Sequence, residues 1–272
     1  MNLFFRCILL MLANSLLSVM CHAGAVTNDA QAQDQLPRVI EMCDGIDEWP
    51  PYMYFKRING EKSSEVVGYA FDYVSRILAR KGIKATIKLI PWNRCVAEVE
   101  SGKYAMLLDA SNSEERDRKF FVSRTYYEVH LVYFYDLSRP KPQINSVADL
   151  KKFRLCGVLG YNYAPFLLEP ENIDTGADGY DKVMAKLKLN RCDAVPDRLE
   201  VAIGFKTIGE LDFIGKNIAY DFIPGVKSLS YHMLISRKLP YSHKLIELID
   251  EGIVEINAHS GAADLAEKYG LR

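Results

Sequence analysis

Apolar residues recur along the chain with two different periods, which predict alternating strands and helices. The runs at 38–43 (RVIEMC) and 104–110 (YAMLLDA) are typical of buried strands, and residues 83–90 (IKATIKLI) alternate as a strand does. Helical spacing over 68–82 and 93–102 ends in both cases at a glycine. The first half of the chain therefore predicts strands separated by helices.

The same alternation continues to the end of the chain. Ser113 is a favourable N-cap residue for another short helix. The remaining pattern predicts strands over 128–136, 154–160, 192–196 and 230–238, and helices over 146–153, 179–193, 197–205 and 242–270. Strands that alternate with helices predict an α/β protein with largely parallel, buried strands, whose ligands bind at the carboxyl ends of the strands.

The N-terminus has the composition of a secretory signal peptide. Arg6 is followed by a short apolar run and by small residues at Ala23 and Ala25. We expect residues 1–25 to be a cleaved signal peptide and residues 26–37 to be a disordered leader. Cys21 also suggests lipid attachment, but the preceding Met20 fits that motif poorly. The mature protein is expected in the periplasm.

Charge and composition exclude several classes of function. Without the signal peptide, the chain carries 33 basic and 35 acidic side chains. This balance favours neither nucleic acid nor an anionic membrane as a partner. The sequence contains no nucleotide-binding or hydrolase motif and no zinc-ligand spacing, so we expect neither an enzyme nor a bound cofactor or metal.

Four of the six cysteines remain after the signal peptide, namely Cys43, Cys95, Cys156 and Cys192. An even number in an oxidising compartment predicts two disulfides. The alternative is four buried thiols. The residues alone leave the three possible pairings open.

Arg116 is the first candidate binding residue. The stretch DASNSEER follows a buried strand and opens a helix, where an anion is favoured and where an arginine can grip a carboxylate. The hydroxyl of Ser111 can contribute to the same site. The alternative is an ion pair of Arg116 with Glu114 or Asp117 on a solvated face.

The two tryptophans of the chain are the next candidates. Trp49, in DEWPPYMYF, and Trp92, in IPWNR, each follow a predicted strand and lie beside proline. Their prolines predict rigid extended loops, so the two rings are expected either in the core or as an aromatic clamp around a ligand.

Asp197 lies between a predicted strand and a predicted helix, in CDAVPDRLEVA. It is a candidate to accept hydrogen bonds from an ammonium group of a ligand. The alternative is a helix N-cap, for which aspartate is a favoured residue.

Taken together, these segments resemble the family 3 extracellular solute-binding proteins, the periplasmic receptors of polar amino-acid ABC transporters. The resemblance covers essentially all of residues 38–272. It rests on the order and spacing of EWPPYMYF, GYAFDYVSRILARKG, IPWNRCVAEVESGKYAMLLDASNSEERDRKFFVSRTYYE, LKKFRLCGVLGYNY, LNRCDAVPDRLEVA and LISRKLPYSHKLIELIDEGI.

The resemblance implies a two-lobed type II periplasmic-binding fold, with a mixed, mostly parallel sheet in each lobe. The first lobe would span 38–128 and 231–272 and the second 130–230, with hinges near 128–131 and 228–231. It also implies a monomer with the disulfides Cys43–Cys95 and Cys156–Cys192, one within each lobe.

The resemblance also implies roles for individual residues. Arg116 matches the arginine that grips the ligand α-carboxylate, and Trp49 and Trp92 match the aromatic residues that enclose the ligand side chain. Asn162 and Tyr163 match a second-lobe loop that meets the carboxylate. Asp197 matches the acid that binds the α-ammonium group.

Three departures set this chain apart from that pattern. Asp109 stands where amino-acid receptors often have a small or hydroxyl residue, so it adds a second acid for an amine or a partner for Arg116. The interval from Asp193 to Asp197 is one residue short and contains Pro196, which can turn Asp197 away from the ligand. Tyrosines also replace small residues in GVLGYNY.

The expected function is the capture of a small polar solute, an amino acid or a related amine, for an ABC permease in the inner membrane. One alternative is a binding protein that signals through a membrane sensor. Another is an enzyme similar to cyclohexadienyl dehydratase, with Asp109 or Asp197 as general acid or base beside Arg116.

Overall fold

The computed structural model describes residues 35–209, 214–259 and 261–271. The predicted signal peptide, residues 26–34 of the predicted leader, and Cys7 and Cys21 lie outside the described residues. Residues 37–272 form one folded unit. Within the described part of the chain, no helix is long and apolar enough to cross a membrane.

Strands of the first half of the chain and one strand from near its end, β13, build a six-stranded mixed sheet in the order β4-β1-β5-β13-β6, with β7 also paired to β13. Strand β1 is parallel to β4 and β5, whereas β13 is antiparallel to β5, β6 and β7. The strands are β1 (Val39–Gly45), β4 (Lys84–Ile90), β5 (Met106–Ser111), β6 (Phe120–Val122), β7 (Tyr127–Val129) and β13 (Leu229–Ser236). We call the part built on this sheet the first lobe.

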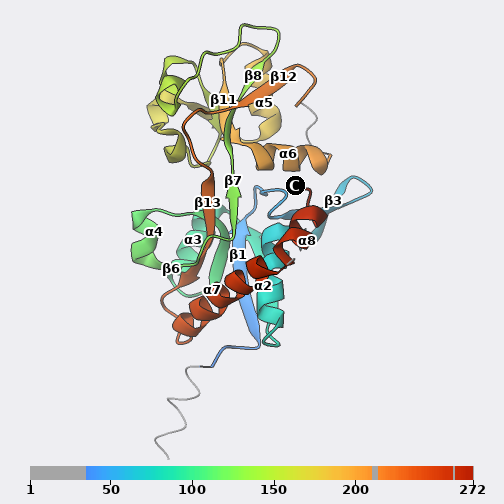
Figure 1. Cartoon of the computed structure of the whole chain (residues 1–272), viewed down its shortest axis with the longest axis vertical. Helices are drawn as coiled ribbons and strands as arrows, with labels where there is room; N and C mark the ends of the chain where they lie inside the picture. The colour runs from blue at the N-terminus through green and yellow to red at the C-terminus, as the bar shows by residue number, and fades with distance from the viewer. Residues whose placement is uncertain (1–34, 210–213, 260, 272) are drawn as a thin grey trace, which may run out of the picture. The chain divides into compact units, whose positions relative to one another are not determined.

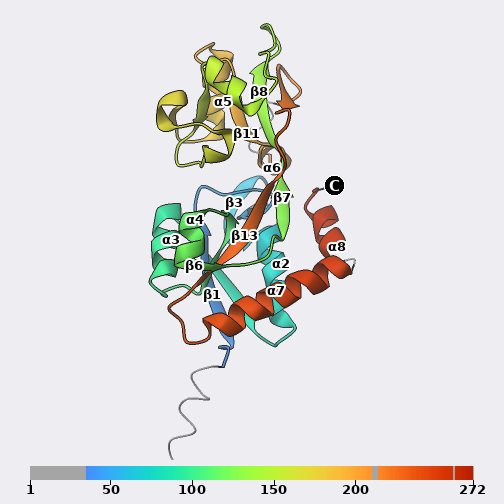
Figure 2. The same cartoon turned by 60° about the vertical axis from the view of Figure 1, so that its left-hand side comes forward.

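The longer helices of the first lobe each bury an apolar face, whereas the short helix at Glu114–Lys119 buries no residue. On α2, Tyr73, Val74 and Ile77 are fully buried at helical spacing. Gly252 of α7 lets the two helices approach closely, because a Cβ there would lie 2.4 Å from Cγ2 of Ile77. Both views of the fold show α7 running beside α2 (Figures 1 and 2). The helices are α2 (Tyr69–Ala79), α3 (Trp92–Glu100), α4 (Glu114–Lys119), α7 (Ser242–Ala258) and α8 (Gly261–Lys268).

The second lobe is built around β8, which pairs antiparallel with β11 and β12. Strands β9 and β10 pair in parallel and join this sheet through a parallel bridge between Leu155 and Ala194. The elements are β8 (Leu131–Asp136), β9 (Cys156–Val158), β10 (Asp174–Ala177), α5 (Tyr180–Lys188), β11 (Val195–Arg198), α6 (Leu199–Thr207) and β12 (Ile218–Phe222), with short 3-10 helices at Val147–Lys152, Ala164–Phe166 and Pro170–Asn172.

Two neighbouring segments connect the sheets of the two lobes. The chain leaves the first sheet after β7 and returns through β13, and these strands pair with Tyr127 opposite Tyr231 and Val129 opposite Leu229. They are drawn in green and orange-red near the middle of Figure 1. The lobe boundaries and the hinges at 128–131 and 228–231 remain predictions.

The expected α/β fold with mixed sheets is confirmed, but parallel pairs do not predominate. The pairings of β8 and β13 are all antiparallel. Both strands lie next to the segments that cross between the lobes. No helical crossover leads into them, so they pair with their neighbours in antiparallel orientation.

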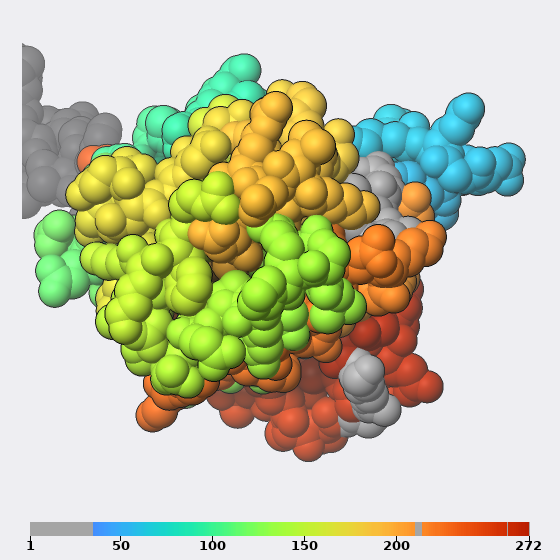
Figure 3. Space-filling model, turned by 90° about the horizontal axis from the view of Figure 1, so that it is seen from above, coloured from blue at the N-terminus to red at the C-terminus, as the bar shows by residue number. Residues whose placement is uncertain are grey.

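Five strands were not predicted from the sequence: β2 (Tyr54–Ile58), β3 (Glu61–Val67), β6, β10 and β12. Strands β2 and β3 form a hairpin whose residues are largely exposed. This hairpin, in light blue, projects beyond the atoms around it in Figure 3. Because few of its residues join a core, it lacks the apolar run that identifies a buried strand.

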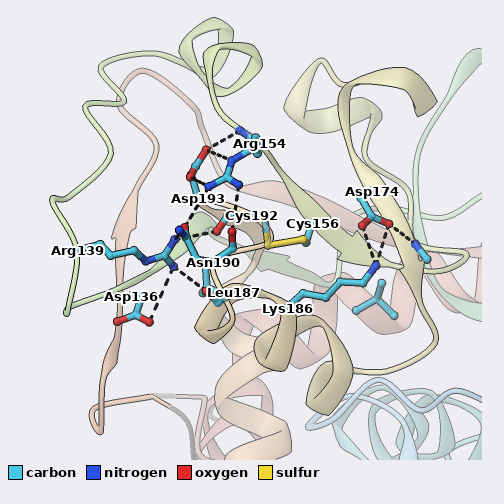
Figure 4. Close-up of a disulfide and its surroundings, with 12 residues drawn as sticks. Asp136, Arg139, Arg154, Cys156, Asp174, Lys186, Leu187, Asn190, Cys192 and Asp193 are labelled. Carbon is cyan, nitrogen blue, oxygen red and sulfur yellow. Dashed lines mark hydrogen bonds and ion pairs between the residues drawn. A yellow bond between two sulfur atoms is a disulfide. The ribbon is translucent and has the colours of Figure 1, made fainter.

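Both predicted disulfides are confirmed. Cys43 at the end of β1 bonds to Cys95 on α3, and Cys156 on β9 bonds to Cys192 before β11. Around the second disulfide, Arg139 donates to the carbonyl oxygens of Leu187 and Cys192 at 2.7 and 3.1 Å. Figure 4 shows how Arg139 ties the end of α5 to the segment that carries Cys192.

Candidate functional site

A cavity of about 110 Å³ lies where several strands end. Asp44 and Gly45 reach it from β1, Asp109 and Ser111 from β5, and Arg198 from β11. The loop after β9, the segment that holds Trp49, and the side chains of Trp92, Arg116 and Tyr231 also line it. The site therefore occupies the carboxyl ends of strands, as the α/β pattern predicts.

Trp49 is held in a tight turn after β1. Its N–H donates to the Met53 carbonyl oxygen at 2.6 Å, and its own carbonyl oxygen accepts from Tyr52 and Met53. The half-buried indole lines the cavity and meets the Tyr161 ring edge-on, with centroids 5.3 Å apart. The prolines that follow Trp49 thus belong to a fixed aromatic wall, not to a helix.

Arg116 lines the same cavity together with Trp92. Ser113 caps α4 by accepting from the Arg116 N–H at 3.3 Å, which confirms the predicted N-cap. The guanidinium carbon lies 5.7 Å from the Trp92 ring centroid, and Nη1 donates to Oγ of Ser111 at 3.1 Å. Its side chain is therefore oriented by Ser111 and Trp92, and the ion pairs that α4 forms among the described residues use Arg118 and Lys119 instead.

Asp109 is a buried acid at the end of β5. Its Oδ1 accepts hydrogen bonds of 2.9 Å from the hydroxyls of Tyr126 and Tyr127. Its Oδ2 is buried and meets no hydrogen-bond donor among the described residues. Burial raises the pKa of Asp109 to about 7, although both tyrosine hydroxyls oppose the shift.

Asp44 is a second buried acid beside Asp109. Its two carboxylate oxygens accept from the backbone N–H groups of Gly45 at 2.6 Å and Leu108 at 3.2 Å. Burial and the neighbouring charge of Asp109 raise the pKa of Asp44 well above its ordinary value. The two acids therefore titrate as a pair that retains a proton near neutral pH.

Glu48 also lines the cavity, but two basic side chains compensate its negative charge. Arg57 on β2 donates to it from both terminal nitrogens, at 3.0 and 3.1 Å, and Nζ of Lys62 on β3 lies 2.6 Å away. Burial raises the pKa of Glu48, but these bonds outweigh burial and leave the pKa below its ordinary value. The β2–β3 hairpin, which was not predicted from the sequence, thus compensates the negative charge of one acid of the cavity.

Asp197 does not line the cavity, whereas its neighbour Arg198 does. The Asp197 side chain is fully buried, and its Oδ1 accepts from the Arg198 backbone N–H at 2.7 Å. The N-cap interpretation is also wrong, because α6 begins after Arg198 without a side-chain cap. Adjacent residues of a strand point to opposite faces. Arg198 therefore points into the cavity where Asp197 was expected to, and Asp197 points away from it.

In the loop after β9, too, a neighbouring residue lines the cavity in place of the predicted one. Gly160, Tyr161 and Asn162 line the cavity, but Tyr163 is buried in the second lobe. The Tyr163 hydroxyl accepts from the Val158 N–H at 2.6 Å, which ties it to the core. Of the two tyrosines in this loop, Tyr161 therefore lines the cavity and the predicted Tyr163 does not.

Several residues of the cavity were not predicted from the sequence; besides Asp44 and Glu48, they include Arg198 and Tyr231. Arg198 is 2% exposed, and Tyr231 on β13 stacks on Tyr127 with ring centroids 4.8 Å apart. Tyr127 in turn stacks on Tyr52 at 3.8 Å. Tyr127 also donates to Asp109, so this row of stacked rings is connected to the buried acid.

The sequence matches the bacterial extracellular solute-binding proteins, family 3, over residues 45–272. The chain belongs to this family. No curated protein matches the sequence as a relative. The family match covers both lobes and every residue that lines the cavity except Asp44.

Solved structures share the fold of this family 3 protein at low sequence identity. An amino acid ABC transporter substrate-binding protein from Streptococcus pneumoniae, solved with L-arginine, has a TM-score of 0.68 and 20% identity over 85% of this chain and 94% of its own. An arginine-, lysine-, histidine-binding protein from Geobacillus stearothermophilus has a TM-score of 0.65 and 17% identity over 87% and 96%. An ancestral amino acid-binding protein, a precursor of cyclohexadienyl dehydratase, has 0.63 and 15% over 85% and 95%.

Proposed function

We propose that this family 3 protein captures an amino acid or a related amine in the periplasm and delivers it to an ABC permease. The observation that carries the proposal is the presence of Arg116 and Asp109 in one small cavity. A guanidinium offers paired N–H donors to a carboxylate, and an acid oxygen without a donor suits an ammonium group. Trp49 and Trp92 supply apolar walls.

The residues around Arg116 support a ligand role for its guanidinium. Ser111 and the Trp92 ring hold the side chain but leave its charge without a carboxylate partner within the described ion pairs. Burial lowers the pKa of Arg116, yet an arginine stays charged under all ordinary conditions. A ligand carboxylate would compensate this charge.

The size of the cavity limits the ligand. About 110 Å³ holds several water molecules but is well below the range of roughly 300–1,000 Å³ that is typical of larger ligands. A compact solute suits this space better than a peptide or an oligosaccharide.

A ligand screen with two readouts tests the proposal. Amino acids, polyamines and small organic acids are screened by thermal shift, with tryptophan fluorescence on the same samples. A ligand at one hundred times its Kd stabilises the native protein by about 2.7 kcal/mol. Because Trp49 and Trp92 are the two tryptophans of the chain, a ligand in the cavity should also change the emission. Stabilisation without an emission change would place the ligand elsewhere.

The partner and the movement belong to the same proposal. The protein acts as a monomer whose lobes close about the hinges near 128–131 and 228–231 and then meet the permease. A permease gene beside this gene supports delivery, whereas a sensor gene there supports signalling through a membrane partner instead.

Acid–base catalysis is a second candidate function. It is favoured by the pKa of about 7 at Asp109, because a group that titrates near neutral pH can donate or accept a proton. Turnover of a prephenate-like or arogenate-like compound, abolished by Asp109→Asn, would support a dehydratase. Binding of such a compound without turnover would support capture alone.

A further inference from the structure

Arg198 is the most deeply buried charged residue that faces the cavity. It is 2% exposed, and its Nη2 donates to the carbonyl oxygen of Asn162. Its Nε and Nη1 are buried and have no hydrogen-bond acceptor within the part of the chain that the structure describes. Burying a guanidinium with unused N–H groups is costly, so this arrangement calls for an acceptor.

The surroundings of Arg198 support its charge, but they leave Nε and Nη1 without an acceptor among the described residues. Nη1 lies 3.8 Å from Oδ1 of Asp197, which is an ion pair but is too long for a hydrogen bond. Burial lowers the pKa of Arg198, but Tyr231 and Asp197 outweigh burial and raise it. Asp197 therefore favours the charged form of the Arg198 guanidinium, while its Nε and Nη1 groups remain available to a ligand.

Among the other described groups of the cavity, a second hydrogen-bond donor is also buried without an acceptor. The indole Nε1 of Trp49, whose ring centroid is 5.8 Å from the Arg198 guanidinium carbon, is buried without an acceptor among the described residues. Asp109 Oδ2 is the one cavity-lining acceptor atom found in the same state. Unsatisfied donors on Arg198 and Trp49 favour a ligand with an acceptor-rich group near them.

The negative charges of the cavity do not cancel this preference. Glu48 is compensated by Arg57 and Lys62, and Asp44 accepts two backbone N–H groups beside a second acid. Asp47 also lines the cavity, but it is exposed, so solvent screens its charge. A cationic side chain on the ligand would meet Arg198 and be repelled in a site with little water.

We propose that Arg198 binds a second anionic group of the solute, so that the ligand is an acidic amino acid or a closely related dicarboxylate held between Arg116 and Arg198. This inference rests on the proposed capture function and specifies its ligand class. The ammonium group of an acidic amino acid would lie at Asp109, and a dicarboxylate without an amine would leave Asp109 protonated.

The test compares ligands that differ only in the second charge. Isothermal titration of the native protein uses glutamate against glutamine and aspartate against asparagine, with arginine and lysine as cationic ligands and succinate and glutarate as diacids without an amine. We expect each acid to bind at least about tenfold tighter than its amide, because hydrogen bonds to a charged group are stronger than those to a neutral one.

Two variants assign this preference to Arg198. Arg198→Gln is expected to bring acid and amide to equal affinity, and Arg198→Lys is expected to keep part of the preference because the charge remains. The comparison of ligands on the native protein stands even if Arg198→Gln fails to fold.

The outcomes separate this inference from the proposed function. Equal affinity for acid and amide, tighter binding of arginine or lysine, or an acid preference that survives Arg198→Gln would overturn the role of Arg198 and leave solute capture intact. If no amino acid, amine or organic acid binds the native protein, the proposed function fails and this inference fails with it.

Discussion

The hydroxyl of Tyr127 donates a hydrogen bond of 2.9 Å to Oδ1 of Asp109, and this bond anchors a buried acid that lines the cavity. Asp109 adopts a φ of +47°, a conformation that aspartate and asparagine tolerate better than most residues. Its position is therefore imposed by the row of tyrosines behind it. An unfavourable backbone conformation and a buried carboxyl group thus coincide at Asp109, which is typical of a functional position.

We predict that Asp109→Asn gains stability relative to the native protein as the pH rises. The pKa of Asp109 is about 7 when folded and about 3.9 in an unfolded chain, so between these values the native state holds more protons than the unfolded state. The native protein therefore loses unfolding free energy between about pH 4 and pH 7, on the order of a few kcal/mol. Urea unfolding of both proteins across this range measures the difference.

Asp47, an exposed acid of the same cavity, provides the control for this prediction. Asp47→Asn is expected to change the unfolding free energy by no more than about 0.5 kcal/mol at any pH, as is usual for surface substitutions. A stability difference between Asp109→Asn and the native protein that stays constant from pH 4 to pH 7 would contradict the raised pKa.

Gly204 on α6 is predicted to be essential for close contact between the lobes. A Cβ at this position would lie 2.3 Å from the carbonyl oxygen of Pro50, in the turn that holds Trp49. We expect Gly204→Ala to cost about 1–3 kcal/mol of unfolding free energy through overpacking and to weaken ligand binding, because it displaces one wall of the cavity. Thr207→Ala, an exposed change on the same helix, should alter neither quantity. Unchanged ligand affinity in Gly204→Ala would show that this contact does not shape the site.

Arg139 is predicted to stabilise the second lobe. Its guanidinium donates to the carbonyl oxygens of Leu187 and Cys192 and to Asn190, close to the Cys156–Cys192 disulfide. Arg139→Met would remove a charged donor from carbonyl groups at the end of α5, at a cost of about 1–3 kcal/mol. Thermal unfolding measures the loss.

An exposed ion pair on α5 gives the matched comparison for Arg139. Lys182 pairs with Asp178, but the two side chains are 59% and 63% exposed. Lys182→Met should therefore leave the unfolding free energy nearly unchanged. Equal losses in the two variants would mean that the bonds of Arg139 add nothing beyond an ordinary surface charge.

The sequence predicted the buried elements better than the exposed ones. Strands such as β1 and β5 carry continuous apolar runs, and helix α2 has a clear apolar face, so their patterns were sufficient. The β2–β3 hairpin has no such run. Its Asn59–Gly60 turn is a recognised hairpin signal that could have revealed it.

For the site, sequence patterns predicted the loops but not the direction of every side chain. Residues Val195 to Arg198 are all buried, so polar and apolar positions do not alternate to show which face meets the ligand. A shift of one residue exchanges the faces of a strand, and this is the difference between Asp197 and Arg198. The same limit applies to Tyr161 and Tyr163, where only the tertiary bond to Val158 places Tyr163 in the core.

The most direct test of solute capture is the effect of Arg116→Gln on the affinity of the tightest ligand from the screen, measured by isothermal titration. Arg118→Gln, on the same short helix and 70% exposed, is the control. If Arg116 holds the ligand carboxylate, Arg116→Gln should weaken binding by about tenfold to a hundredfold or more while Arg118→Gln binds normally. Binding by Arg116→Gln within about twofold of the native protein would contradict the central role of this cavity.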